Sequence, residues 1–295
     1  MKYYFGIDIG GTNIRIGVMS EENKLVKVIK ESSKDIKTSK DLMDKITHLY
    51  EECNEYECSA LGIGVCGPCN NETGIASFIP NMGLENVDFK VLNLGVPTFI
   101  GNDANVACLA EALLGAGRGK NTVQYLTLST GVGGGLFLNG TLVTGKYGFA
   151  QEVGHIKIKD SLAKQNKYTS SGSFESVCSG TSLTLKAQSL GIEASHAGHI
   201  FDNDSEVCKA LVLEYVTNLA DAMRNIAYFI EPEVFVIGGG VSKSYDYFAP
   251  LLIEKFNEEI FDGLKNKIEI KRAELDQDTG IYGAWLLGKY YLNKK

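Results

Sequence analysis

Two glycine-rich turns carry the residues most able to do chemistry. The first follows an apolar strand and reads Asp8-Ile9-Gly10-Gly11-Thr12-Asn13, and the second reads Ser129-Thr130-Gly131-Val132-Gly133-Gly134. Adjacent glycines let the backbone reach positive φ and approach a ligand closely, which leaves amide N–H groups free to face an anion. The repetition predicts two lobes that bind one polyphosphate.

A third glycine turn, Gly238-Gly239-Gly240, comes directly after the apolar residues 234–237. Two better-known glycine signatures do not apply. Residues 62–67 match G-x-G-x-x-G, but turn residues follow where a dinucleotide-binding fold needs a helix. The P-loop pattern G-x-x-x-x-G-K-[ST] is absent from the sequence.

The composition is that of an ordinary globular protein. The chain has 295 residues, of which 44% are hydrophobic and 22% charged, so it is long enough for two core-forming domains. A net charge of −7 argues against nucleic acid or an anionic membrane as the main partner. No apolar run approaches the roughly 20 residues that span a bilayer. The first strand also contains Asp8 where a signal peptide would be apolar, and we expect a cytoplasmic protein.

Seven cysteines are scattered along the chain, which favours reduced thiols over a disulfide framework. Cys66-Gly67-Pro68-Cys69 resembles the C-x-x-C pair of thioredoxin-type proteins. Such a pair should follow a strand and open a helix. The strand is predicted at 60–65, but residues 70–74 have turn chemistry, so a redox protein stays only as an alternative.

Each half of the chain predicts an antiparallel meander followed by alternating helices and strands. The strands are expected at 3–9, 13–19, 25–30, 60–65, 96–102, 234–237 and 268–270, and the helices at 39–56, 104–114, 204–230, 244–260 and 279–292. A hairpin turn is expected at Asn139-Gly140. The pattern predicts duplicated α/β lobes with a cleft between them. The N-terminal lobe should span 1–115, with the C-terminal helix of about 280–295 packing back on it, and the second lobe 116–279.

The glycine turns and several further blocks together resemble the ROK family of sugar kinases and sugar-responsive repressors, within the actin-like ATPase superfamily. The resemblance covers nearly the whole chain and rests on residues 8–12, 101–105, 130–135, 152–155, 175–180 and 236–240. It implies an α/β fold of two actin-like (ribonuclease H-like) lobes with a nucleotide and sugar cleft between them.

By this resemblance, Asp103 is the general base of a kinase. It stands where a strand ends and a helix begins, and a helix N-terminus favours the ionised form of a carboxylate. Phosphoryl transfer depends mainly on alignment and charge neutralisation, so modest help from a base is sufficient. The alternative is that Asp103 only caps the helix.

The resemblance also implies two sets of binding residues. The sugar hydroxyls should be held by Asn81, Asn102, Glu152, His155 and Glu175. The nucleotide should be held by Asp8, Gly10, Gly11, Thr12, Asn13, Thr130, Gly131, Gly133, Gly134, Gly238, Gly239 and Gly240. Amides and carboxylates suit vicinal hydroxyls, which offer donors and acceptors in pairs. A core role for His155 and a plain surface role for Glu175 are the alternatives.

The chain departs from the family pattern at one place. Many ROK kinases hold a structural zinc with a C-x-C-G-x-x-G-C-x-E cluster and the histidine of E-x-G-H. The matching residues 166–175 keep Gly172 and Glu175 but contain no cysteine. Too few soft ligands remain for a tetrahedral site, so we expect no structural zinc and no metal-binding residues. Tyr3 already lies in the first strand, so no helix-turn-helix is expected before it, which disfavours the repressor branch.

The resemblance therefore implies an ATP- and Mg²⁺-dependent kinase that phosphorylates the 6-hydroxyl of a free hexose or N-acylhexosamine. Glucokinase-like and N-acetylmannosamine kinase-like activities are favoured, with allose as a further substrate to consider. We expect a homodimer that binds neither nucleic acid nor membrane. The alternative is a non-catalytic ROK-type sugar sensor, against which the presence of Asp103 argues.

Overall fold

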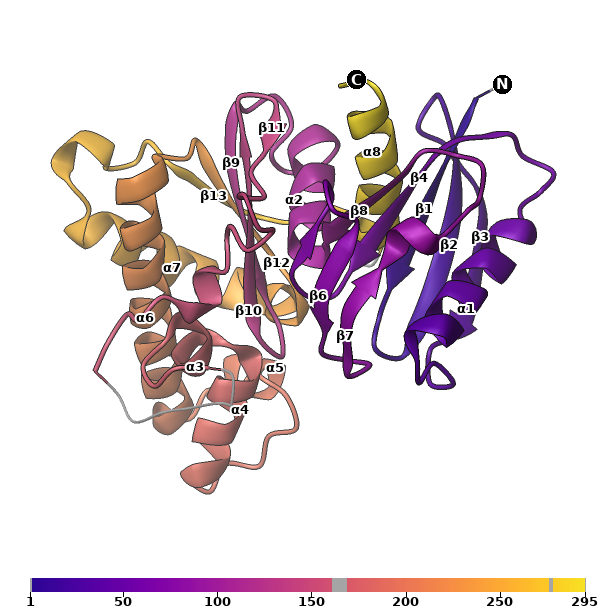
Figure 1. Ribbon diagram of the computed structural model, residues 1–295. Helices are drawn as coiled ribbons and strands as arrows, with labels where there is room; N and C mark the ends of the chain where they lie inside the picture. Colours follow the sequence, from indigo (N-terminus) through magenta and orange to yellow (C-terminus); the bar gives the residue numbers. More distant parts are fainter. Residues whose placement is uncertain (1, 161–168, 276–277, 295) are drawn as a thin grey trace. The chain divides into compact units, whose positions relative to one another are not determined.

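The computed structural model describes residues 2–160, 169–275 and 278–294, and the chain divides into two compact units. Unit 1 comprises Met1–Leu114, Leu142–Ala150 and Gln277–Lys295, and unit 2 comprises Gly115–Thr141 and Gln151–Asp276. Each unit has its own five-stranded sheet and hydrophobic core (Figure 1). The expected fold class, an α/β protein with two sheet-containing lobes, is confirmed.

The sheet of unit 1 has the strand order β3-β2-β1-β4-β8. Its strands are β1 (Tyr3–Ile9), β2 (Asn13–Ser20), β3 (Leu25–Ser32), β4 (Cys58–Val65) and β8 (Thr98–Asn102). β1, β2 and β3 form the expected antiparallel meander, whereas β1, β4 and β8 run parallel. The carboxyl ends of these three parallel strands therefore meet at one edge of the sheet.

Side chains of β1 alternate between two environments, as the period of a strand requires. Phe5, Ile7 and Ile9 share a core with Leu42 and Ile46 of helix α1 (Ser39–Glu51), whose first turn is capped by a Thr38 capping box. The other face of β1 packs on the C-terminal helix α8 (Thr279–Leu292). The central strands β1 and β4 are thus covered on both faces, which explains why nearly all of their residues are buried, whereas the edge strand β3 alternates.

The sheet of unit 2 repeats this topology in the order β11-β10-β9-β12-β13. Its strands are β9 (Thr122–Leu128), β10 (Val132–Leu138), β11 (Thr141–Leu142), β12 (Val234–Gly238) and β13 (Glu269–Arg272). The turn between β10 and β11 has positive φ at Asn139 and Gly140, as expected for a two-residue hairpin. Helices α6 (Glu206–Ile230) and α7 (Tyr245–Glu259) cover this sheet and share its core.

Several short elements were not predicted. A small sheet consists of β5 (Cys69–Asn70), β6 (Ile75–Ile79) and β7 (Leu84–Asp88), and three short helices are α3 (Phe174–Cys178), α4 (Gly180–Ser189) and α5 (Gly198–Phe201). Such segments are too short to show a clear hydrophobic period. Within the described parts of the chain, no helix combines the length and apolar character needed to cross a membrane.

Helix α8 approaches the sheet of unit 1 so closely that only glycine fits at the contact. A methyl carbon at Gly62 of β4 would overlap the carbonyl oxygen of Ala284, and one at Gly6 of β1 would lie 2.5 Å from the amide nitrogen of Trp285. Backbone atoms cannot move aside as a flexible side chain can. The packing of α8 therefore depends on the absence of side chains at these two strand positions.

We expect Gly62→Ala to lower the free energy of unfolding by about 3 kcal/mol, because the added methyl must displace α8. Gly64→Ala is the matched control, since the same strand offers ordinary contacts there, the nearest at 3.6 Å to Val106. The control should stay within about 0.5 kcal/mol of the unchanged protein. Urea unfolding of both variants checks this, and equal stabilities would contradict the close packing.

Candidate functional site

Asp8 lies at the carboxyl end of β1 in an ion-pair network. Its Oδ2 accepts from Arg15 Nη2 at 2.7 Å, and Arg15 Nη1 contacts Oδ1 of Asp278 at 3.3 Å. A methyl at Gly280, in the first turn of α8, would lie 2.7 Å from the Asp8 carboxyl carbon. The carboxylate therefore sits beside the start of a helix, where negative charge is favoured.

The glycines of the first turn do not adopt positive φ; Gly11 is needed because the chain passes close to a neighbouring side chain. Gly10 and Gly11 have no positive φ, and the Gly10 amide donates to the Asn13 carbonyl at 2.9 Å. A methyl at Gly11 would lie 3.0 Å from Cβ of Asn81. Close approach is thus the reason for Gly11, and it brings the predicted nucleotide turn against a predicted sugar residue.

Asn102, and not Asp103, caps helix α2 (Asp103–Leu113). Its Oδ1 accepts from the amides of Ala104 at 3.0 Å and Asn105 at 3.3 Å, and its Nδ2 donates to the Gly67 carbonyl at 3.2 Å. Asp103 is the first helical residue, and its Oδ1 accepts from the Ala104 amide at 2.8 Å. The hypothesis that Asp103 serves only as the cap is therefore wrong, since α2 already has its cap.

Some neighbours of Asp103 raise the pKa of its carboxyl group and others lower it. Dense protein atoms around the carboxyl group raise the pKa of Asp103 by desolvation, the Ala104 amide lowers it, the Asp8 carboxylate raises it, and a hydrogen bond from Cys66 lowers it. Although those atoms crowd the carboxyl group, the residue keeps a solvent-accessible surface. Because water reaches that surface, desolvation raises the pKa of Asp103 less than complete burial would.

Glu152, His155 and Glu175 belong to unit 2. Glu152 precedes the 3₁₀ turn Val153–His155, and its Oε2 lies 4.0 Å from Nε2 of His155. About half of the His155 side-chain surface is exposed, which excludes the core role considered for it. Glu175 is half-buried in α3, and its Oε2 accepts from the Val132 amide at 2.9 Å. Glu175 therefore connects α3 to the second glycine turn.

The second glycine turn is held by two backbone hydrogen bonds of Ser129. The Ser129 amide donates to the Gly131 carbonyl at 2.9 Å, and the Gly180 amide at the start of α4 donates to the Ser129 carbonyl at 2.7 Å. Gly133 and Gly134 are paired with β9 as part of β10, so they belong to the ladder and not to an open loop. Thr130, by contrast, is exposed.

The third glycine turn contains the one predicted binding glycine with a positive φ. Gly239 has φ of 81°, and a methyl there would lie 2.5 Å from the Leu128 carbonyl oxygen. Gly238 ends β12, where a methyl would overlap the Tyr125 hydroxyl, and Gly240 is exposed. Of the predicted binding glycines, only Gly239 uses the freedom to adopt positive φ. The others do not: Gly10, Gly11, Gly131, Gly133, Gly134, Gly238 and Gly240.

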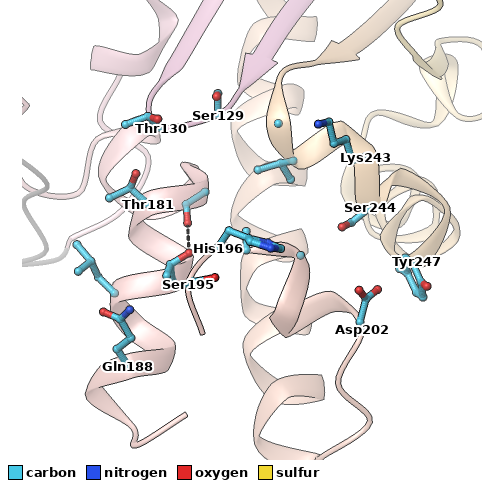
Figure 2. A pocket seen from close by; sticks show the side chains of 17 residues that line it. Ser129, Thr130, Thr181, Gln188, Ser195, His196, Asp202, Lys243, Ser244 and Tyr247 are labelled. Atoms are coloured by element: carbon cyan, nitrogen blue, oxygen red, sulfur yellow. Dashed lines mark hydrogen bonds between the residues drawn. The ribbon is translucent and has the colours of Figure 1, made fainter. Parts of the chain in front are cut away.

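A cavity of about 760 Å³ opens in unit 2 beside these two turns. Predicted residues Thr130 and Gly240 line it, together with residues that the sequence analysis missed, among them Thr181, Gln188, His196, Asp202, Lys243 and Tyr247. Figure 2 shows Ser129, Thr130 and Lys243 toward one end, Gln188 and Asp202 toward the other, and His196 between them. Two of these residues had a nearby sequence signal: Thr181 directly follows the block 175–180, and Lys243 comes three residues after Gly240.

The described residues form no cluster of ligands for a tightly bound metal ion. Over residues 2–160, 169–275 and 278–294, no three His, Cys, Asp or Glu side chains are grouped so that they could hold one. Cys178 is fully buried, which raises its pKa well above the usual value and keeps the thiol protonated. Residues 166–168, the first part of the stretch 166–175 that was expected to lack zinc ligands, lie outside the described residues. The donors described do not fit a structural zinc.

Comparison with known proteins gives a consistent result. A model of the ROK family matches residues 4–290. A glucokinase of Thermotoga maritima is 31% identical, covering 95% of each chain, and an N-acetyl-D-glucosamine kinase of Histophilus somni is 31% identical over 95% of this chain and 97% of its own. A ROK family glucokinase from Streptomyces griseus, solved with glucose and AMPPNP, matches with a TM-score of 0.77 and 26% identity over 97% of this chain and 99% of that one.

We expect Glu175→Ala to lower the free energy of unfolding by about 1–3 kcal/mol, because the Val132 amide loses its acceptor. Glu175→Gln keeps a carbonyl oxygen at that position and should lose less than half as much. Glu193→Ala, at an exposed position of the same unit, is the control and should change little. Chemical denaturation distinguishes the three, and equal losses for Ala and Gln would show that the hydrogen bond is unimportant.

Proposed function

The chain belongs to the ROK family, and from that premise we propose that it is an ATP-dependent sugar kinase. The proposed reaction transfers the terminal phosphoryl group of ATP to the 6-hydroxyl of a free hexose or N-acylhexosamine. Glucose and N-acetylmannosamine are the favoured types of substrate, with allose as a further one. Unit 1 would supply the base, and unit 2 the nucleotide pocket.

The relatives support this class of substrate. Proteins named glucokinase and N-acetyl-D-glucosamine kinase are equally similar to this chain, and the match extends over nearly the whole length of each. These two sugars differ only in the substituent at carbon 2. The shared class is therefore a hexose with a primary hydroxyl at carbon 6.

One observation carries the proposal: Asp103 is an accessible carboxylate at the carboxyl end of a parallel strand, in a helix that Asn102 already caps. In sheets of this kind, ligands bind outside the carboxyl ends of the strands. An ionised Asp103 would accept the proton of the sugar hydroxyl as it attacks phosphorus. The amide of Ala104 and the thiol of Cys66 both favour the ionised form.

The cavity of unit 2 suits a nucleoside triphosphate. Its volume lies within the range of roughly 300–1,000 Å³ that is usual for small-molecule sites. Hydroxyl groups of Ser129, Thr130 and Thr181 with the Lys243 ammonium group would hold phosphate oxygens. Gln188, toward the other end, with His196 and Tyr247 would hold the base and ribose. Mg²⁺, when bound with the nucleotide, supplies neutralisation of phosphate charge.

The remaining sugar contacts are proposed for Asn81, Asn102, Glu152, His155 and Glu175. Much of the hydrogen-bonding capacity of Asn102 is used by α2 and by Gly67, so its contribution would be to hold Asp103 as well as to contact sugar. Asn81 is exposed, and the exposed His155 lies beside Glu152. These polar groups would reject a wrong epimer, because it would leave them unpaired.

A coupled ADP-release assay on glucose, mannose, allose, N-acetylglucosamine and N-acetylmannosamine tests the proposal. We expect sugar-dependent ADP release with at least one of them, at a rate on the order of 1–10³ s⁻¹. Reactions without sugar provide the background of ATP hydrolysis. Binding of a sugar without any turnover would support the sensor in place of the kinase.

We expect Asp103→Asn to lower kcat on the order of 10²- to 10⁴-fold, because the amide cannot accept the hydroxyl proton. The KM for sugar should change little, since an amide keeps the size and polarity of the side chain. Asp44→Asn, on the exposed face of α1, is the control and should keep full activity. Near-complete turnover by Asp103→Asn would remove Asp103 from the proposed mechanism.

A further inference from the structure

Cys66 lies between two residues of the proposed site. It follows β4 directly, and its Sγ accepts a hydrogen bond from Nδ2 of Asn81 at 3.3 Å. Its thiol lies close enough to the Asp103 carboxyl group to lower the pKa of that group, as a hydrogen-bond donor does. A thiol carries one hydrogen, so an ionised carboxylate on one side and an amide N–H on the other satisfy both of its hydrogen-bonding functions.

The loop of Cys66 is fixed relative to Asp103. Nδ2 of Asn102 donates to the carbonyl of Gly67 at 3.2 Å, which ties the residue after Cys66 to the residue before Asp103. A methyl at Gly67, where φ is 116°, would overlap the carbonyl oxygen of Phe78. The thiol is therefore held by its own backbone, and its contact with the carboxylate does not depend on a flexible loop.

The second cysteine of the motif argues against redox chemistry. Cys69 is buried, and burial together with the nearby Asp103 charge raises its pKa to about 12. A thiol of that kind is a poor nucleophile, because the thiolate is the reactive form. At neutral pH Cys69 is an uncharged neighbour of Asp103. The C-x-x-C motif therefore need not be a redox-active pair.

We propose that Cys66 is a positioning residue of this kinase: its thiol donates to the Asp103 carboxylate while accepting from Asn81, so that one side chain orients both the base and a sugar-binding amide. This inference rests on the proposed function for its role in catalysis. The hydrogen bond itself is a property of the folded chain and can be measured without turnover.

Several neighbouring groups shift the pKa of Asp103, and the measurement must distinguish the effect of Cys66 from theirs. They include Asp8 from β1 and Cys66 from the loop after β4. Cys69 of β5 is itself affected by the charge of Asp103 but is uncharged at neutral pH. Asp8 is engaged by Arg15, which also contacts Asp278 at the start of α8. Removing Cys66 leaves the raising effects of desolvation and of Asp8 in place, so the pKa of Asp103 should rise.

The test is a carboxyl ¹³C NMR titration of the full-length chain labelled at aspartate, with the Asp103 resonance assigned by its loss in Asp103→Asn. In Cys66→Ala the midpoint should move to higher pH by roughly 0.5 to 1. Cys66→Ser keeps a donor and an acceptor and should restore the midpoint to within about 0.2 of the unchanged protein. Cys69→Ala removes an uncharged thiol and should leave the midpoint where it was.

Steady-state kinetics of the same variants provide a second test. The acidic limb of kcat/KM should shift to higher pH in Cys66→Ala in parallel with the titration, the KM for sugar should rise several-fold through Asn81, and Cys66→Ser should reverse both changes. An unshifted Asp103 midpoint in a folded Cys66→Ala variant would overturn the inference. A chain without activity on any sugar would instead overturn the proposed function, and the titration would still decide the role of Cys66.

Discussion

The contact of α8 with the sheet of unit 1 is the constraint on which the arrangement of the acidic residues depends. At Gly6 and Gly62 the backbone of the sheet packs directly against the backbone of the helix. On the same helix, a methyl at Gly283 would overlap the Val106 carbonyl of α2. Gly280, the second residue of the same helix, lies beside Asp8. Because α2 starts at Asp103, the packing of one helix sets the positions of both carboxylates, and each depends on glycine where a side chain would separate the elements.

Unit 2 meets the same requirement with a sheet of the same strand order. Gly154 packs against the Val132 carbonyl, and Gly239 packs against that of Leu128, so the segments that follow β9 and β12 are brought close to one another. In both units polar turns thus follow the carboxyl ends of parallel strands, where α/β sheets bind ligands. The repeated chemistry of the glycine turns in the sequence reflects this repeated topology.

Long elements with a clear hydrophobic period were predictable from the sequence, as α6 and the strands of the first meander show. The small sheet of β5, β6 and β7 was not, because its strands are short. Adjacent glycines permit positive φ, but Gly10 and Gly11 do not use it, and close approach to Asn81 is the constraint at Gly11. Cys66 illustrates the other limit: residue types suggested a redox pair, but only the fold brings Asn81 and Asp103 to its thiol. Likewise, Gln188 and His196 line the cavity although no pattern in the sequence singles them out.

The central claim is that Asp103 accepts the proton of a sugar hydroxyl. A crystal structure with a sugar that is turned over and a non-hydrolysable ATP analogue measures this most directly, through the distance between the Asp103 carboxylate and the oxygen of the sugar 6-hydroxyl. We predict a hydrogen bond of roughly 2.6–3.2 Å. A sugar bound with its 6-hydroxyl out of reach of Asp103, or facing another carboxylate, would contradict the account.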